Sequence, residues 1–335
     1  MKAIRVRHPA SLDTLSWEDV PDAPAPGPGE IRVRLRAASV NFRDSLVAKG
    51  FFPAADGRIP LSDGAGEVVE VGADVAGFAV GDAVVSTFHP NWNEGDIDRA
   101  LLTNAPGGPA DGYACEYATR PVSHFTLAPR GLSHAEAATL TCAGVTAWRA
   151  VVTDGQVKPG DSVLVLGSGG VSLFALQFAK AAGATVIATS STPDKLERLK
   201  ALGADHVINH REVEQWGEAA AALTPRGVDH VIEVGGPQTM PQSLAAVRSG
   251  GHVAVIGAVG GFAVDTMPFA VVQAKRLRLQ GVTVGSRRDQ TDMIRGIEAT
   301  DIRPVLDRSF ALADLAAALR HLDSGAHFGK ICIEI

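Results

Sequence analysis

The sequence predicts an α/β protein with two domains, one of which contains a doubly wound parallel sheet of six strands. From about residue 133 onward, short apolar stretches alternate with stretches of helical period, as in a parallel sheet covered on both faces. Before that point, short strand-like stretches are separated by glycine and proline, which is typical of a β-rich domain. The length of 335 residues suits two domains of roughly 150 residues each.

The first 120 residues are predicted to form a small β-barrel. Ile31–Arg36 alternates apolar and charged residues with period two, as a half-buried strand does. Glu67–Val71 and Ala83–Ser86 are further short strands, and turns that contain glycine lie between them. The stretch from His89 to Asp111 has no hydrophobic period, so we expect a long irregular loop there.

The second part of the chain begins with a helix-start signal. Ser133 and Glu136 have the spacing of a capping box, in which each side chain accepts a backbone N–H of the other residue. The six predicted strands of the sheet are Ser162–Leu166, Thr185–Thr189, His206–Ile208, His230–Val234, His252–Ile256 and Leu279–Val284. The predicted helices are Val171–Ala182, Pro193–Leu202 and Leu312–Leu322, and the last predicted strand is Lys330–Ile335.

Composition and charge argue against several classes of protein. Lys and Arg number 31 against 37 Asp and Glu, a net charge of −6, so we expect no nucleic-acid partner. No apolar run reaches the roughly 18 residues of a membrane span, and the first eight residues alternate like a strand rather than a secretion signal. The three cysteines Cys115, Cys142 and Cys332 include no close pair, which favours a reducing, cytoplasmic location.

The most informative segment joins the apolar strand Ser162–Leu166 to the helix that follows it. Its first glycine permits a tight turn, its second lets the backbone approach a pyrophosphate, and the helix N-terminus offers N–H groups and partial positive charge. The third position of the G-x-G-x-x-G pattern is Ser172, which is small enough for close packing. We expect a dinucleotide to bind along Gly167, Ser168, Gly169, Gly170 and Val171. A turn without a ligand is the alternative.

The end of the second strand indicates which dinucleotide binds. An NAD site usually places Asp or Glu about 20 residues after the glycines, where it binds the ribose 2′-hydroxyl. This chain has Ser190 and Ser191 there, and Lys195 follows on the next helix. Hydroxyls and an ammonium group suit a 2′-phosphate, which a carboxylate would repel. The sequence therefore predicts NADPH, with NADH as the alternative because Asp194 lies beside Lys195.

Several stretches together resemble the medium-chain dehydrogenase/reductase superfamily, and most closely its zinc-independent branch of quinone oxidoreductases and enoyl reductases. These stretches are Val40–Asp44, Asp63–Val69, Val80–Val84, Ala137–Trp148, the glycine loop and Gly203–Asn209. The resemblance implies a Rossmann dinucleotide-binding domain, residues 126–285, inserted into a β-rich barrel domain similar to chaperonin-10 (GroES-like), residues 1–125 and 286–335. It also implies a homodimer joined through residues 279–284.

The zinc ligands of related enzymes are mostly missing. The zinc-dependent relatives carry Cys where this chain has Asn41, and a His-Glu pair where it has Asp63 and Gly64, whereas their third ligand position is Cys142. A catalytic zinc needs three protein ligands, and residues 90–110 lack the cysteines of the structural zinc lobe. We therefore expect no zinc and place Cys142 in the substrate pocket. Convergence of Asp63, Cys142 and a histidine on a metal is the alternative.

Without a metal, another group must polarise the substrate. The resemblance places Asn41 beside the nicotinamide, where its amide can donate to a carbonyl oxygen that gains charge during hydride transfer. Arg43 and Asp44 follow as further catalytic candidates, with a structural ion pair as the alternative. Relatives often have a tyrosine a few residues later, but this chain has Ser45 and Leu46, so solvent is expected to supply the proton.

Further residues are assigned to the cofactor by the resemblance. Thr146 is expected near the nicotinamide, and His210 near the adenine. The strand ends and the return to the first domain contribute Val234, Gly235, Ile256, Gly257, Ala258, Gly285, Ser286 and Lys330. Trp92 is expected to line the substrate pocket. The alternative for each is an ordinary structural role, such as a turn glycine, a surface histidine or a packing tryptophan.

These observations predict a zinc-free oxidoreductase that transfers hydride from NADPH to a quinone or an α,β-unsaturated carbonyl compound. An NAD(P)-dependent alcohol dehydrogenase or ketone reductase is the first alternative, although a carbonyl substrate usually needs the stronger polarisation that a metal provides. A non-catalytic dinucleotide sensor or RNA-binding protein is an alternative of another class. We expect a small-molecule substrate and no membrane partner.

Overall fold

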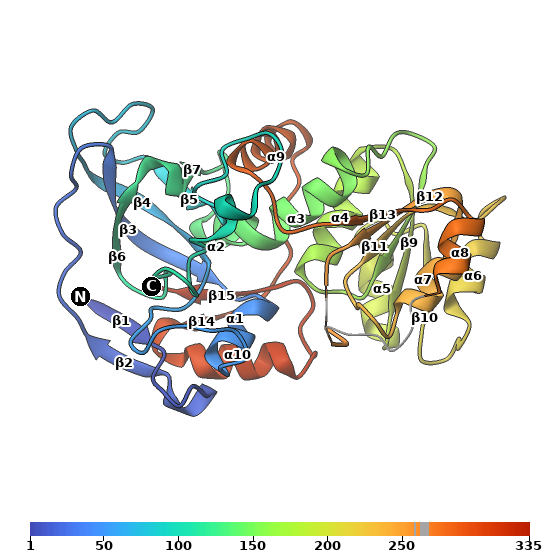
Figure 1. Cartoon of the computed structure of the whole chain (residues 1–335), viewed down its shortest axis with the longest axis horizontal. Helices are drawn as coiled ribbons and strands as arrows, with labels where there is room; N and C mark the ends of the chain where they lie inside the picture. Colours follow the sequence, from blue (N-terminus) through green and yellow to red (C-terminus); the bar gives the residue numbers. More distant parts are fainter. Residues whose placement is uncertain (258, 262–267) are drawn as a thin grey trace. The chain divides into compact units, whose positions relative to one another are not determined.

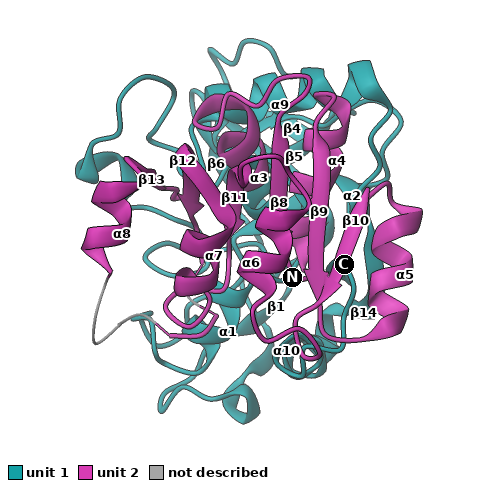
Figure 2. Cartoon of the chain, turned by 90° about the vertical axis from the view of Figure 1, so that its right-hand side faces the viewer, with its two compact units in different colours: residues 1–145, 285–335 teal, residues 146–284 magenta. Residues whose placement is uncertain are grey.

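The computed structural model describes residues 1–257, 259–261 and 268–335, which form two compact units. Unit 1 comprises Met1–Val145 and Gly285–Ile335, and unit 2 comprises Thr146–Val284 (Figure 2). The sequence analysis placed the first boundary at residue 125, whereas the contacts assign residues 126–145 to unit 1. The reason is that helix α2 (His134–Ala138) packs against strands of the unit 1 sheet.

Unit 2 is built on a sheet of six strands that are all parallel to their neighbours. The strands are β8 (Ser162–Leu166), β9 (Thr185–Ser190), β10 (His206–Asn209), β11 (Val228–Glu233), β12 (Val247–Val255) and β13 (Arg278–Gly281). Their order is β10-β9-β8-β11-β12-β13, so the chain begins in the middle of the sheet and winds outward in both directions. The predicted doubly wound sheet is confirmed.

Helices connect these strands and pack on the sheet (Figure 1). They are α3 (Val145–Trp148), the π-turn η5 (Arg149–Thr153), α4 (Gly170–Ala181), α5 (Pro193–Ala201), α6 (Trp216–Ala222), α7 (Met240–Ala246) and α8 (Phe269–Ala274). Helix α4 contacts β8 and β9, and α7 contacts β11 and β12. The central strand is thereby fully covered, which explains why Val163, Leu164 and Val165 form an uninterrupted buried apolar run.

Unit 1 contains a two-stranded and a seven-stranded sheet. The first pairs β1 (Lys2–Arg5) with β2 (Ser16–Asp19). The second contains, in spatial order, β14 (Leu306–Ala311), β15 (Lys330–Glu334), β3 (Glu30–Ser39), β4 (Asp63–Val71), β5 (Ala83–Ser86) and β7 (Phe125–Leu127), and β6 (Tyr117–Pro121) pairs with β3.

The long strand β3 organises this sheet. One edge pairs with β4 through two register shifts, between Arg32 and Val33 and between Leu35 and Ala37. On its other edge, the first half of β3 pairs with β6 and its end pairs with β15. Register shifts bend a strand and increase its twist, so β3 curves as the predicted barrel requires.

Most helices of unit 1 are short, and the longest is α9 (Arg287–Thr300), with 14 residues. The helices are η1 (Leu12–Thr14), α1 (Phe42–Ala48), η2 (Arg99–Leu102), η3 (Val122–His124), α2, the π-turn η4 (Leu140–Gly144), α9, η6 (Leu312–Asp314) and α10 (Leu315–Asp323). Ser133 caps α2 by accepting the N–H of Glu136, which confirms the capping box. In the part of the chain that the structure describes, no helix is long and apolar enough to cross a membrane.

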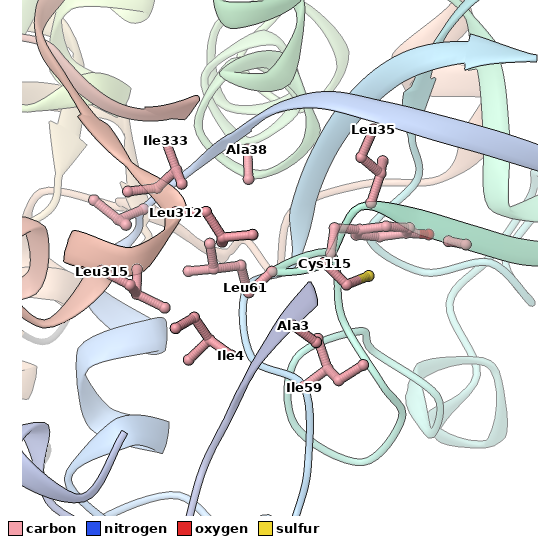
Figure 3. Packing of buried hydrophobic residues seen from close by; sticks show 14 of the residues in the cluster. Ala3, Ile4, Leu35, Ala38, Ile59, Leu61, Cys115, Leu312, Leu315 and Ile333 are labelled. Atoms are coloured by element: carbon pink, nitrogen blue, oxygen red, sulfur yellow. The ribbon is translucent and has the colours of Figure 1, made fainter. Parts of the chain in front are cut away.

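The core of unit 1 joins segments that lie far apart in the sequence. Ile4 from β1, Leu61 from the segment before β4, Leu315 from α10 and Ile333 from β15 belong to one buried cluster (Figure 3). The amino- and carboxyl-terminal segments of the chain therefore stabilise the same domain, as expected when a second domain is inserted between them.

Two elements of unit 1 differ from the prediction. After Gly285 the sequence predicted one helix, Leu312–Leu322. The structure has a further helix, α9 (Arg287–Thr300), and a further strand, β14, before it. Helix α9 begins with a capping box between Ser286 and Asp289, and it buries Met293 and Ile297. In unit 2, the strand predicted at 279–284 ends earlier, at Gly281.

Candidate active site

Asn41 lies where β3 ends and α1 begins. The Asp44 carboxylate accepts the backbone N–H of Asn41 at 2.9 Å and its side-chain Nδ2 at 3.3 Å. Nδ2 also lies 3.5 Å from the Ser62 hydroxyl, which is a long and weak contact. Asn41 and Asp44 are both buried, so the first turn of α1 holds the amide in place.

The other end of the Asn41 side chain contacts Lys330, the first residue of β15. The ammonium group donates to Asn41 Oδ1 at 2.6 Å and to the Val40 carbonyl at 2.7 Å. Lys330 is only 4% exposed. An ammonium group only donates, so the amide oxygen must face Lys330 and the amide nitrogen must face Asp44. The orientation of the Asn41 amide is thus fixed from both sides.

Asp63 completes this buried group. Its carboxylate accepts from Ser39 at 2.8 Å and from Ser62 at 2.7 Å, and it lies 3.8 Å from the Lys330 ammonium. Strand pairing places it there, because Asp63 of β4 is in register with Ser39 of β3. Gly64 is required next to it, since a Cβ there would lie 2.6 Å from Tyr113.

Arg43 and Asp44, predicted as catalytic candidates, form an ion pair. Arg43 donates to Asp44 at 3.0 Å and to the Pro106 carbonyl at 3.0 Å, and its guanidinium lies 5.0 Å from the centre of the Phe88 ring. Burial raises the pKa of the Asp44 carboxyl, and the Arg43 charge opposes that shift. These contacts fasten the irregular segment after Phe88 to α1, which is a structural role.

Cys142 lies in the π-turn η4 and is partly exposed. Desolvation by the surrounding protein raises the pKa of its thiol, and the nearby Asp63 carboxylate raises it further. The next residue upstream, Thr141, exchanges hydrogen bonds with Ser86 and so anchors the turn to β5.

The residues at this position do not fit a zinc ion. The Asn41 oxygen already accepts from an ammonium group, and the same ammonium lies beside Asp63. Among residues 1–257, 259–261 and 268–335, no group of three His, Cys, Asp or Glu side chains could hold a metal.

In unit 2, the glycine loop after β8 has the backbone that a dinucleotide site needs. Gly167 has φ of 75°, and no described atom lies within 4 Å of the place that a Cβ would take. Gly169 is the N-cap of α4, so the first N–H groups of the helix are available near Gly170 and Val171. These features fit a pyrophosphate.

Ser172 explains the departure from the glycine pattern. Its hydroxyl is buried and donates to the Leu166 carbonyl at 2.7 Å. The bond ties the first turn of α4 to the end of β8. A serine therefore gives the close helix packing that the third glycine gives in the usual pattern.

The ends of β9 and β10 place polar groups at the same edge of the sheet. Ser190 is buried and Ser191 is half-buried, while Thr192 is the N-cap of α5 and Lys195 lies in the first turn of that helix. His210 follows β10 and donates its backbone N–H to the Ser190 carbonyl. Burial lowers the pKa of the His210 imidazole, so the ring is neutral at pH 7.

A buried carboxylate that the sequence analysis missed shapes the loop after β11. Glu233 is fully buried and accepts the N–H groups of Gly235 and Gly236 at 2.8 Å each and the Thr239 hydroxyl at 2.6 Å. It also accepts the Ser243 hydroxyl. The signal available in the sequence was an acidic residue at the end of a buried strand, directly before a glycine pair.

The glycines predicted at the strand ends are required by packing. A Cβ at Gly257 would lie 1.9 Å from the Val234 carbonyl, and one at Gly235 would lie 2.3 Å from the Thr239 hydroxyl. The loops after β11 and β12 therefore approach each other closely. Ile256 is half-buried, and Ala258 lies outside the described residues.

The remaining predicted residues are distributed over both units. Thr146 is buried on α3 in unit 2. In unit 1, Gly285 precedes the N-cap residue Ser286 of α9, whose hydroxyl exchanges hydrogen bonds with Asp289. Trp92 is buried, and its carbonyl accepts the Arg287 N–H at 2.9 Å. The structure thus brings together Asn41, Asp44 and Lys330, and it gives Trp92 packing partners.

Comparison with known proteins identifies the family. Residues 27–130 match the model of the alcohol dehydrogenase GroES-like domain, and residues 170–299 match that of the zinc-binding dehydrogenases. A zinc-type alcohol dehydrogenase-like protein of Schizosaccharomyces pombe is 43% identical over 97% of this chain and 96% of its own length. The chain belongs to the medium-chain dehydrogenase/reductase superfamily.

Other relatives in this superfamily carry different names. The acryloyl-coenzyme A reductase of Sulfurisphaera tokodaii is 27% identical over the full length of both chains. Among solved structures, an NAD-dependent alcohol dehydrogenase matches with a TM-score of 0.91 and 34% identity over all of both chains. A crotonyl-CoA carboxylase/reductase, AntE, in complex with NADP matches with a TM-score of 0.86 and 25% identity, over 100% of this chain and 95% of that one. The chain is thus similar both to dehydrogenases of alcohols and to reductases of unsaturated thioesters.

Proposed function

We propose that this oxidoreductase transfers hydride from NADPH, without zinc, to a quinone or an α,β-unsaturated carbonyl compound. The observation that carries the proposal is the fixed amide of Asn41. Lys330 donates to the amide oxygen and Asp44 accepts one N–H, so the second N–H of Nδ2 is what Asn41 can offer to a ligand. An uncharged donor that does not titrate suits an oxygen that gains negative charge only during the reaction.

The glycine loop and the end of β9 would hold the cofactor. Gly167–Val171 would receive the pyrophosphate, and Ser190, Ser191 and Lys195 would receive the 2′-phosphate. His210, Thr146, Val234, Gly235, Ile256 and Gly257 remain proposed cofactor contacts. The bound nicotinamide supplies hydride. The NADP complex of a relative supports NADPH, whereas the NAD-dependent relative keeps NADH as the alternative.

The protein's part in the reaction is to stabilise charge and to position the substrate. When hydride adds to the β-carbon of an enone, the double-bond electrons move toward the carbonyl oxygen, which becomes an enolate oxygen. Asn41 Nδ2 would donate to that oxygen, and water would then protonate the α-carbon to give the saturated ketone. Loss of one such donor typically slows an enzyme about 100- to 1000-fold.

Two relatives favour a conjugated double bond as the reduced group, because their names describe reduction of acryloyl-CoA and crotonyl-CoA. The test is to incubate the protein with NADPH and an α,β-unsaturated ketone and to identify the product. A saturated ketone supports the proposal. An allylic alcohol supports the second candidate, an alcohol dehydrogenase or ketone reductase, which the names of other relatives favour.

Assembly and location complete the proposal. Strand β13 is the last strand of its sheet, and no strand of the described residues pairs with its outer edge. We expect a homodimer through residues 279–284, which light scattering after gel filtration can test. The three cysteines are free, which fits a cytoplasmic enzyme. Tight NADPH binding without turnover of any enone, quinone or ketone would instead favour a non-catalytic sensor.

A further inference from the structure

The ammonium group of Lys330 lies inside the protein without a close carboxylate partner. Its two hydrogen-bond acceptors are neutral oxygens, the Val40 carbonyl and the Asn41 amide oxygen. The nearest carboxylate oxygen in the described contacts is that of Asp63, at 3.8 Å. Burying a charge is costly unless other groups compensate it, so a lysine at this place is expected to have a function.

The surroundings of Lys330 balance its charge at a distance. Asp63 and Asp44 contribute carboxylates, and Arg43 pairs with Asp44. The Asp63 carboxylate is held by two hydroxyls, from Ser39 and Ser62, so it cannot turn away from the ammonium group. The ammonium group therefore lies 2.6 Å from the Asn41 amide oxygen and 3.8 Å from the Asp63 carboxylate.

This arrangement determines how the Asn41 amide points. If the amide were flipped, its nitrogen would lie 2.6 Å from an ammonium group and its oxygen would lie 3.3 Å from a carboxylate oxygen, and both contacts would be repulsive. In the observed orientation both contacts are attractive. Among the described residues, the second N–H of Nδ2 has only the 3.5 Å contact with Ser62, so it is the donor that a ligand can take over.

We propose that Lys330 is a positioning residue: its ammonium group is a fixed internal cation that orients the Asn41 amide and occupies the place between Asn41 and Asp63. The proposal rests on the function proposed for Asn41. It assigns to Lys330 a role on the amide rather than a contact with the cofactor, which the family resemblance suggested.

The same placement opposes metal binding. A divalent ion between Asn41 and Asp63 would have to displace the ammonium group or lie beside it, and like charges at that distance repel strongly in a buried site. A single lysine thus provides a permanent positive charge where a metal would otherwise be needed. We expect the purified protein to retain no zinc after dialysis against a zinc-containing and then a zinc-free buffer.

The experiment combines three variants with a control. Lys330→Met removes the charge with little change in length, Asn41→Ala removes the amide, and the third variant carries both changes. Lys49→Met is the matched control, because Lys49 pairs with Asp323 at 2.6 Å and is one-third exposed. For each protein, hydride transfer to an enone is measured at saturating NADPH, together with the Kd for NADPH, the melting temperature and the zinc content.

Lys330→Met should slow hydride transfer about tenfold or more, while the Kd for NADPH changes less than about threefold. The double variant should be no slower than Asn41→Ala, because the orientation of the Asn41 amide has no effect on the rate in a protein that lacks this amide. Its fall in melting temperature should be smaller than the sum of the two single falls. Lys49→Met should match the wild type.

Other results would overturn the proposal. Effects of Lys330→Met and Asn41→Ala that add, in rate and in melting temperature, would show that the two residues act independently. A large rise in the Kd for NADPH with an unchanged rate at saturation would make Lys330 a cofactor contact. Retention of one zinc per chain would contradict the exclusion of metal. If even the wild type reduces no enone, the proposed function fails, and the melting temperatures and zinc content still decide the role of Lys330.

Discussion

Replacing Glu233 by glutamine is expected to destabilise unit 2 and to loosen the loop after β11. One carboxylate oxygen accepts three hydrogen bonds, from Gly235, Gly236 and Thr239, and the other accepts one from Ser243. The amide oxygen of glutamine can keep the first three bonds, but they lose the charge. Hydrogen bonds to charged groups exceed neutral ones by about 1 kcal/mol, so the three bonds lose about 3 kcal/mol.

Urea unfolding followed by far-ultraviolet circular dichroism measures this loss. The matched control is Glu197→Gln, because Glu197 is exposed and pairs with Lys200 three residues away on the helix surface, so its change should cost less than about 0.5 kcal/mol. Glu233→Gln should also raise the Kd for NADPH, since Gly235 lies among the proposed cofactor contacts. If the free energy of unfolding of Glu233→Gln lies within about 0.5 kcal/mol of the wild-type value, the four hydrogen bonds do not stabilise the loop.

Three further changes test other parts of the structure. Gly257→Ala should destabilise the protein by about 2 kcal/mol or more in the same unfolding assay, because its Cβ would meet the Val234 carbonyl. A free energy of unfolding within about 0.5 kcal/mol of the wild-type value would contradict this. Desolvation lowers the pKa of His252 to about 3. Below about pH 6.5, His252 therefore binds a proton in the unfolded chain but not in the folded chain. His252 should therefore account for about 2 kcal/mol of the stability that the wild type loses between pH 7 and 5, and His252→Leu should lose less by about that amount; parallel pH profiles would contradict this. Ser191→Asp should lower the preference for NADPH over NADH about tenfold or more in kcat/KM, and an unchanged ratio would remove the proposed 2′-phosphate site.

The parallel sheet could be predicted because its strands are indicated by short local patterns in the sequence. The strand Ser162–Leu166 is buried throughout and apolar from Val163 onward, as expected of a strand covered on both faces, and it leads directly into the glycine loop. Helix α9 was missed because most of its residues are polar and its buried residues are few. Its clearest signal is the capping box of Ser286 and Asp289, which was not used.

The site of unit 1 could be predicted only in part. The sequence itself places Asn41, Arg43 and Asp44 close together, because they lie within four consecutive positions. Lys330 reaches Asn41 across 289 residues of sequence, and no local pattern indicates that contact. It depends on the pairing of β15 with β3, which is a property of the folded sheet.

Glu233 illustrates a different limit. The sequence analysis assigned Gly235 to the cofactor, and the structure shows that the Glu233 carboxylate accepts the N–H groups of Gly235 and Gly236. A strand-end carboxylate of this kind looks the same in the sequence as a ligand-binding one. The hydroxyls of Thr239 and Ser243 donate to Glu233 only in the folded loop, so no local sequence pattern indicates these hydrogen bonds.

The most direct test of the central claim is one assay on one preparation. Metal content is measured on the purified protein, and the same sample is then given NADPH and an α,β-unsaturated ketone while NADPH absorbance and product are followed. The account predicts NADPH oxidation to a saturated ketone by protein that contains far less than one metal ion per chain, and no inhibition by chelators. Activity that disappears with a chelator and returns with zinc would contradict it.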